Sequence, residues 1–210
     1  MQRTILLSAS GCLIKLGFEN LYLCLRVVCD VQGRLTLGLY NSYGTKFHEV
    51  HRRAVTRALA LCTGFDCNLA LFGFPLPPEA ETPKEISEFL ADKTTISTKD
   101  ALMKLSSEGR FHLFPFPDRG FPPQLGMVVV TTQHPEEKKA VSAAFIANAL
   151  LNGKSVCLVF GLGHRGLGKV EEIAEYHFEV TGRNVGLETC TALGAVVGVV
   201  SATLKCMRRE

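Results

Sequence analysis

A glycine-rich segment at residues 160–168 is the clearest candidate for chemistry in the sequence. The apolar run 155–160 ends there, and glycines follow at positions 161, 163, 166 and 168. Because glycine has no Cβ, such a loop lets the backbone approach a ligand closely. Gly161, Gly163 and Gly166 also form G-x-G-x-x-G, the pattern with which a strand and a helix hold the pyrophosphate of a dinucleotide. The segment is therefore the first candidate binding site.

Three interpretations of this loop stay open. In a Rossmann-type dinucleotide site, Glu179 would bind the ribose, because it follows Gly161 at about the usual spacing of twenty residues. Against this, the helix predicted after the loop is short, and the pattern stands close to the last predicted strand. In the second interpretation the glycines serve only tight turns. The third interpretation depends on the next segment of small residues.

That segment, residues 184–198, is a turn of small residues that leads directly into a helix. Small side chains on one helix face let a backbone or a flat ligand pack closely. Glu188 stands where this helix begins, so it could act as a general base or could cap the first turn. Two such loops therefore lie close together in the sequence, each after a strand of the predicted parallel sheet.

Basic residues gather in a predicted helix at residues 46–62. Their side chains could contact nucleic-acid phosphates or could form a solvated helix face, and the spacing does not decide between the two. Arg165 lies with His164 inside the glycine-rich loop, where it could meet a substrate or simply be exposed. The basic residues of the helix are Lys46, His48, His51, Arg52, Arg53 and Arg57.

The elements that would position these groups alternate along the chain. Apolar runs predict strands, and helical periodicity with capping residues predicts the helices between them. Strands that are apolar throughout predict a parallel sheet covered by helices on both faces. Residues 1–33 fit this pattern poorly, and two alternatives stay open for them: an extra strand or helix, or an N-terminal extension before a domain at 34–210. The predicted strands are 35–40, 68–72, 125–130, 155–160 and 176–180, and the predicted helices are 46–62, 84–92, 98–107, 135–152, 169–174 and 188–204.

The composition indicates a globular protein with a substantial core and says little about its partners. Apolar residues make up 47% of the chain and charged residues 20%, and the net charge is only +3. The eight cysteines form no C-x-x-C pair and no zinc-ligand spacing, so we expect reduced core thiols, no metal and a cytoplasmic protein. No apolar run reaches the length of a membrane span, about 18 residues, so we expect no membrane segment.

Three short motifs resemble the SpoU-like branch of the SPOUT, or α/β-knot, methyltransferase superfamily. The strand end Phe160-Gly161 with Gly166-Leu167 matches its second motif, and residues 186–192 occupy the frame of its third. Its first motif is similar to Asn41 and Gly44, followed by Arg57-Ala58 and Gly64. The resemblance covers about residues 34–204. The amino-acid sequence as a whole also resembles an archaeal domain-of-unknown-function family (number 531). That resemblance implies no particular substrate.

The resemblance implies a C-terminal trefoil knot, a homodimer and an S-adenosylmethionine-dependent methyltransferase that acts on RNA, such as tRNA or rRNA. It implies Arg57 and Glu188 as catalytic residues. It implies RNA contacts for Lys46, Arg52, Arg53 and Arg165. The residues that it assigns to the cofactor are Thr131, Thr132, Gln133, Gly161, Leu162, Gly163, Gly166, Val180, Gly186, Leu187 and Cys190.

Departures from the SpoU-like pattern leave a second function open. Gly163 stands where that branch has a glutamate, Glu188 where it has an asparagine, and Cys190 where it has a serine. Cofactor binding is thus better supported than any particular methyl transfer. The alternative is a non-catalytic RNA- or nucleotide-binding protein that keeps the fold, and a Rossmann-type dinucleotide-binding protein is a further alternative.

Overall fold

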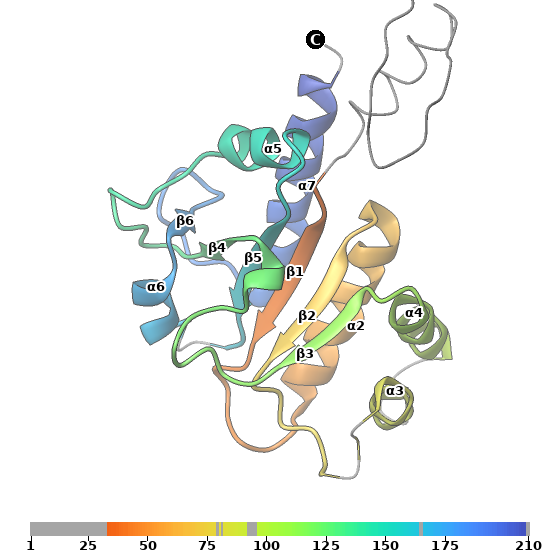
Figure 1. The fold of residues 1–210 in the computed structure, drawn as a ribbon. Coiled ribbons are helices and arrows are strands. Elements are labelled where there is room, and N and C mark those ends of the chain that lie inside the picture. Colours follow the sequence, from red (N-terminus) through yellow and green to blue (C-terminus); the bar gives the residue numbers. More distant parts are fainter. Residues whose placement is uncertain (1–32, 79, 81, 92–95, 164–165, 209–210) are drawn as a thin grey trace, which may run out of the picture. The chain divides into compact units, whose positions relative to one another are not determined.

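The computed structural model describes residues 33–78, 80, 82–91, 96–163 and 166–208 (Figure 1). The predicted extension at 1–33 lies outside the described residues, apart from Gly33, and stays a prediction. Gly33 is buried and donates its N–H to the carbonyl of Leu150. A Cβ at this glycine would lie 1.9 Å from the carbonyl oxygen of Lys154. His164 and Arg165 also lie outside the described residues.

Six parallel strands form one sheet in the order β3-β2-β1-β5-β4-β6. The central strands β1 and β5 pair from Leu35 with Val156 to Tyr40 with Gly161. The chain leaves β1 toward β2 and leaves β5 toward β6, so their carboxyl ends flank a point where the connections diverge. Open parallel sheets bind ligands at such points. The strands are β1 (Leu35–Tyr40), β2 (Asn68–Phe72), β3 (Phe111–Phe114), β4 (Met127–Thr131), β5 (Val156–Gly161) and β6 (Tyr176–Phe178).

The two faces of the sheet are covered unequally. Alternate residues of β5 enter different cores: Leu158 packs on the side of the long helices, whereas Val159 packs on the side of α6. Helices on both faces were predicted, but the second face is covered mainly by α6, the 3-10 helix η1 and a loop before it. Figure 1 shows α2 and α7 together behind the sheet. The helices are α2 (Glu49–Phe65), α3 (Pro83–Ala91), α4 (Ile96–Ser107), η1 (Pro123–Leu125), α5 (Ala143–Leu151), α6 (Lys169–Ile173) and α7 (Thr189–Met207).

The predicted helix at 135–152 is wrong in its first half. The helix α5 begins at Ala143, where the hydroxyl of Ser142 accepts the N–H of Phe145. The preceding residues instead pair with the edge strand β6, since Val141 donates to His177 and His177 donates to Lys139. Hydrogen bonding to the edge strand β6, which would otherwise be unpaired, therefore took the place of a helix in this segment.

Two further elements differ from the expectation. The strand β3 was not predicted, because the prolines of residues 115–117 indicated a loop, but it ends at Phe114, just before them. The helix α2 begins at Glu49 rather than at residue 46, so Lys46 and His48 precede it. Its first turn is set by His48, whose N–H is accepted by Nδ1 of His51 at 3.0 Å.

The helix α7 is more apolar than the sequence analysis allowed for. By length and composition it could cross a membrane, with a mean hydropathy of 1.7, although a core helix passes the same test. The expectation missed it because glycine, serine and threonine interrupt its aliphatic residues without adding charge. Leu193, Val196, Val197 and Val200 are buried in the main core, yet only 22% of the apolar window is buried.

Candidate functional site

A cavity of about 700 Å³ opens at the carboxyl ends of β4, β5 and β6, beside the first turn of α7. Three loops that lie far apart in the sequence meet there, namely the one after β4, the glycine-rich loop after β5 and the segment 179–188 before α7. Most of the predicted cofactor residues line this cavity, together with Glu188. They are Thr131, Thr132, Gln133, Gly161, Gly163, Gly166, Val180, Gly186 and Leu187.

Two predicted cofactor residues are placed beside the cavity rather than on its lining. Leu162 is fully buried, and its carbonyl accepts the hydroxyl of Ser42. Cys190 is half-buried, and its pKa is raised by burial and then by the carboxylate of Glu188. A thiol that is held protonated in this way is a poor nucleophile.

The glycines of the loop serve its own folding as well as any ligand. Gly163 has a φ of +83°, and a Cβ on it would lie 3.0 Å from the ring of Tyr43. A Cβ on Gly161 would lie 2.8 Å from the carbonyl oxygen of Gly166. The loop therefore folds back on itself and against the β1–α2 connection, which supports the turn interpretation in part.

Glu188 caps α7. Its carboxylate accepts the N–H groups of Cys190 at 2.9 Å and Thr191 at 3.3 Å, as an acid at a helix start does. The next residue, Thr189, donates its hydroxyl to the carbonyl of Gly161 at 2.9 Å. The first turn of α7 is thus fixed directly to the glycine-rich loop, and Glu188 is part of the cavity lining.

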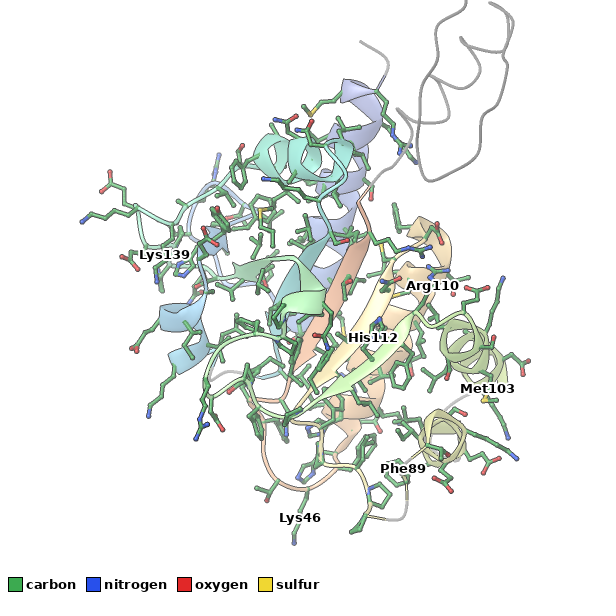
Figure 2. All side chains as sticks on the ribbon, in the orientation of Figure 1. Lys46, Phe89, Met103, Arg110, His112 and Lys139 are labelled. Carbon is green, nitrogen blue, oxygen red and sulfur yellow. The ribbon has the colours of Figure 1, made fainter. Side chains whose placement is uncertain are left out.

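Arg53 and Arg57 are exposed on α2, the helix that packs along α7. Their charges lower the pKa of Cys190, against the larger effects that raise it. Both arginines therefore act on the same helix end that Glu188 caps. Arg52 differs, since it forms an ion pair with Glu49. Lys46 is exposed before the helix and extends away from the sheet (Figure 2).

The loop after β1 supports the site from outside the cavity, a role that the sequence analysis did not assign although it matched Asn41 and Gly44 to the first SpoU-like motif. Its buried Asn41 accepts Nε2–H of His51 at 2.9 Å and donates to the carbonyls of Gly44 and Gly73. Ser42 and Tyr43 then contact the glycine-rich loop at Leu162 and Gly163. The sequence signal was the N-x-x-G turn directly after a strand that borders β5.

The cavity is acidic. Glu171, Glu179 and Glu188 line it, and none of its described lining residues is a lysine or an arginine. Burial raises the pKa of Glu179, but hydrogen bonds from the hydroxyl and N–H of Thr181 and the N–H of Gly182 outweigh this, so the pKa lies below its ordinary value. That carboxylate is therefore charged at neutral pH. The geometry suits a ligand that carries positive charge.

Potential metal-ligating side chains are not clustered in the described part of the chain. Within residues 33–208, leaving out the ranges not described, no three His, Cys, Asp or Glu side chains are grouped so that they could hold an ion. Burial raises the pKa of the Cys67 thiol to about 12 and also raises that of Cys157, so both thiols are protonated in the core.

Comparison with known proteins identifies both the family and the fold. Residues 35–201 match the family described as "Protein of unknown function (DUF531)". A relative from Methanocaldococcus jannaschii, "Uncharacterized protein MJ0224", is 42% identical over 170 residues, which cover 80% of this chain and 93% of the relative.

Solved structures with a similar fold include methyltransferases by name. A probable methyltransferase from Bordetella pertussis Tohama I matches with a TM-score of 0.54 and 14% identity, over 84% of this chain and 99% of its own. The SpoU methyltransferase AviRb from Streptomyces viridochromogenes matches with a TM-score of 0.53 and 12% identity, over 94% of this chain and 68% of its own. AviRb has also been solved with AdoMet; that structure matches with a TM-score of 0.50.

These matches confirm the resemblance to SpoU-like proteins at the level of the fold. The chain belongs to the DUF531 family and has the α/β fold of the SpoU methyltransferases.

Proposed function

We propose that the protein is an S-adenosylmethionine-dependent methyltransferase that acts on RNA. The observation that carries the proposal is the acidic cavity assembled from three loops at the carboxyl ends of β4, β5 and β6. The same fold holds AdoMet in AviRb. A cytoplasmic location, a trefoil knot through the segment 155–192 and a homodimer are parts of the same proposal.

The charge of the cavity favours this cofactor over a dinucleotide. S-adenosylmethionine carries a sulfonium and an ammonium group against one carboxylate, so it is a net cation. A dinucleotide pyrophosphate is an anion and would face Glu171, Glu179 and Glu188 without a described cation on the lining. In addition, the helix after the loop, α6, has five residues, which is short for a Rossmann crossover.

The cofactor would supply an electrophilic methyl group, and the chain would supply its position. Backbone groups of residues 131–133, 161–163 and 180–190 would hold it, since glycines allow close approach there. Arg57 would stabilise the acceptor or its RNA phosphate at the first turn of α7. Glu188 would take the proton that the acceptor loses as the new bond forms and the sulfur–methyl bond breaks.

Support for RNA and for a second copy comes from the surfaces around the cavity. Arg53 and Arg57 are exposed on α2 beside the first turn of α7, and Lys46 precedes α2. Together with Arg52 and Arg165, these residues would contact RNA phosphates. On the neighbouring elements, Val199 of α7 and Phe145 of α5 are 41% and 42% exposed. A second copy that packs on α5 and α7 would cover these apolar side chains.

A non-catalytic nucleotide- or RNA-binding protein is the second candidate. The observation that favours it is the double role of Glu188, whose carboxylate already accepts two N–H groups of α7. Such a protein would bind the cofactor or the RNA without methyl transfer.

Calorimetry with S-adenosylmethionine, its neutral product S-adenosylhomocysteine and NAD tests the cofactor. We expect binding of S-adenosylmethionine and weak or no binding of NAD. The variant E171Q should weaken S-adenosylmethionine more than the neutral product, because it removes one negative charge from the lining. The absence of S-adenosylmethionine binding to folded protein would overturn the proposal.

Transfer of a tritiated methyl group to bulk tRNA and rRNA then tests catalysis. Incorporation supports the enzyme, whereas tight cofactor binding without incorporation into either pool supports the non-catalytic candidate.

Sedimentation equilibrium with V199D and F145D, against the surface control K99A, tests the dimer: the two aspartate variants should shift the chain to the monomer.

A further inference from the structure

A second cavity, of about 520 Å³, lies on the other side of the glycine-rich loop. It opens at the carboxyl end of β1 and extends to the start of α6. Gly166 and Leu167 line both this cavity and the larger one. The glycine-rich loop is therefore a thin shared wall, and a group in the second cavity would lie next to a ligand in the first.

The side walls of this cavity suit a flat ring. Tyr40 lines it, and its ring meets Phe116 edge to face, with centroids 5.6 Å apart. Pro117 and Ile173 add apolar surface from the loop before η1 and from α6. Ile173 is 42% exposed, an uncovered aliphatic side chain at the cavity. Aromatic and aliphatic walls of this kind accept the face of a nucleobase.

The two charged side chains of the cavity are not used by the described fold. Within the described ranges, no hydrogen bond or ion pair involves the carboxylate of Asp118 or the ammonium of Lys169, although both residues line the cavity. Burial and then the Asp118 carboxylate raise the pKa of Tyr40, so its hydroxyl remains a donor. An acceptor, a cation and a hydroxyl donor thus come from three different elements.

We propose that this second cavity binds one nucleotide of an RNA, and that it selects a base with an exocyclic amino group. Asp118 accepts a hydrogen bond from the amino group, Lys169 neutralises the phosphate, and the base packs against Tyr40 and Ile173. A carbonyl oxygen in place of the amino group could not donate a hydrogen bond to the carboxylate. Its partial negative charge would instead be repelled by the carboxylate, so such a base would bind more weakly. The inference rests on the proposed function, since it gives the acceptor RNA a place beside the cofactor.

Cytidine and uridine 5′-monophosphates test this selection, because at the same ring position one has an amino group and the other a carbonyl oxygen. We would follow amide shifts of Gly166, Gly168 and Lys169 by NMR during titration of each nucleotide. The wild-type protein should bind the cytidine nucleotide roughly tenfold more tightly, the worth of one hydrogen bond to a charged acceptor.

The variant D118N distinguishes recognition from a structural role. An amide can also donate to the uridine carbonyl, so D118N should lose or invert the preference. The matched control D100N, at an exposed acid of α4, should keep it. No shifts at about 10 mM nucleotide, which exceeds the Kd of a millimolar site, would overturn the inference, and so would a preference that D118N leaves unchanged.

The failure of this inference can be separated from failure of the proposed function. Calorimetry with S-adenosylmethionine should give the same affinity for D118N as for the wild-type protein. If nucleotide selection holds while S-adenosylmethionine does not bind, the second cavity stands and the methyltransferase proposal falls. If S-adenosylmethionine binds but neither nucleotide does, the methyltransferase proposal stands and the nucleotide site falls.

Discussion

Oδ1 of Asn41 accepts the Nε2–H of the buried His51 at 2.9 Å. Nδ1 of the same imidazole accepts the N–H of His48, so the neutral ring with its proton on Nε2 satisfies both bonds. This pair joins the loop after β1 to the first turn of α2. Because Ser42 and Tyr43 of that loop contact the glycine-rich loop, the pair also supports the candidate cofactor cavity.

The variant N41A should therefore destabilise the protein. It leaves the buried His51 without an acceptor and the carbonyl of Gly73 without the amide donor, a loss of about 2–3 kcal/mol. Urea unfolding measures this change in the free energy of unfolding. N148A, at an exposed asparagine of α5, is the matched control and should stay close to the wild-type value. An N41A protein of unchanged stability would contradict the assigned bonds.

The stability of the protein should fall in mild acid because of His51. Burial and then the nearby His48 lower the pKa of His51 from its ordinary value. The unfolded chain therefore takes up the proton more readily, so this stabilisation is complete above about pH 6.5 and is lost as the pH falls below it toward the folded pKa.

Urea midpoints measured between about pH 5 and 8 test this dependence. H51Q removes the titrating group and keeps a side-chain donor, so its profile should be flatter than that of the wild-type protein. His112 also has a pKa lowered by burial, and therefore some slope should remain in H51Q. Parallel profiles for the two proteins would show that His51 does not contribute.

The variant G163A should weaken the candidate cofactor site. It places a Cβ at a φ of +83° and 3.0 Å from the Tyr43 ring, which costs about 1 kcal/mol or more. We expect a loss of stability and weaker S-adenosylmethionine binding in calorimetry. G64A, in the last turn of α2 with no atom near the new Cβ, should instead leave binding unchanged. If both variants bind alike, the loop conformation does not matter for the ligand.

Substitutions at Glu188 should separate capping from catalysis. E188A removes the acceptor for two N–H groups of α7 and should cost about 1 kcal/mol of stability. E188S retains a capping oxygen, so it should keep most of the stability but lose the ability to take a proton. Thermal unfolding and tritium transfer measure the two effects. Full methyl transfer by E188S would exclude Glu188 as the base.

The variants R53A and R57A should weaken RNA binding and reduce its dependence on salt. Each removes an exposed positive charge beside the first turn of α7, and each lost phosphate contact should lower the salt slope by about 1. K104A, on α4, is the control. Affinities for tRNA across a salt series check the effect; a slope equal to that of K104A would exclude a phosphate contact. R57A should lower the transfer rate further than R53A.

Local patterns in the sequence determined most of the elements and the ligand-facing loops. The apolar runs of β1, β2 and β5 are recognisable because strands buried on both faces need no polar residues, and the glycines at 161–168 mark the loop after β5. Local patterns could not exclude a helix at residues 136–141. The extended conformation there comes from pairing with His177 of β6, which is distant in the sequence.

Only the tertiary structure decided which of these residues form a site. The register of Tyr40 beside Gly161 brings the loops after β1 and β5 together, although more than a hundred residues separate them. The same arrangement places one cavity on each side of the glycine-rich loop. Contacts of this kind depend on long-range strand pairing and on side-chain direction, and a local sequence pattern encodes neither.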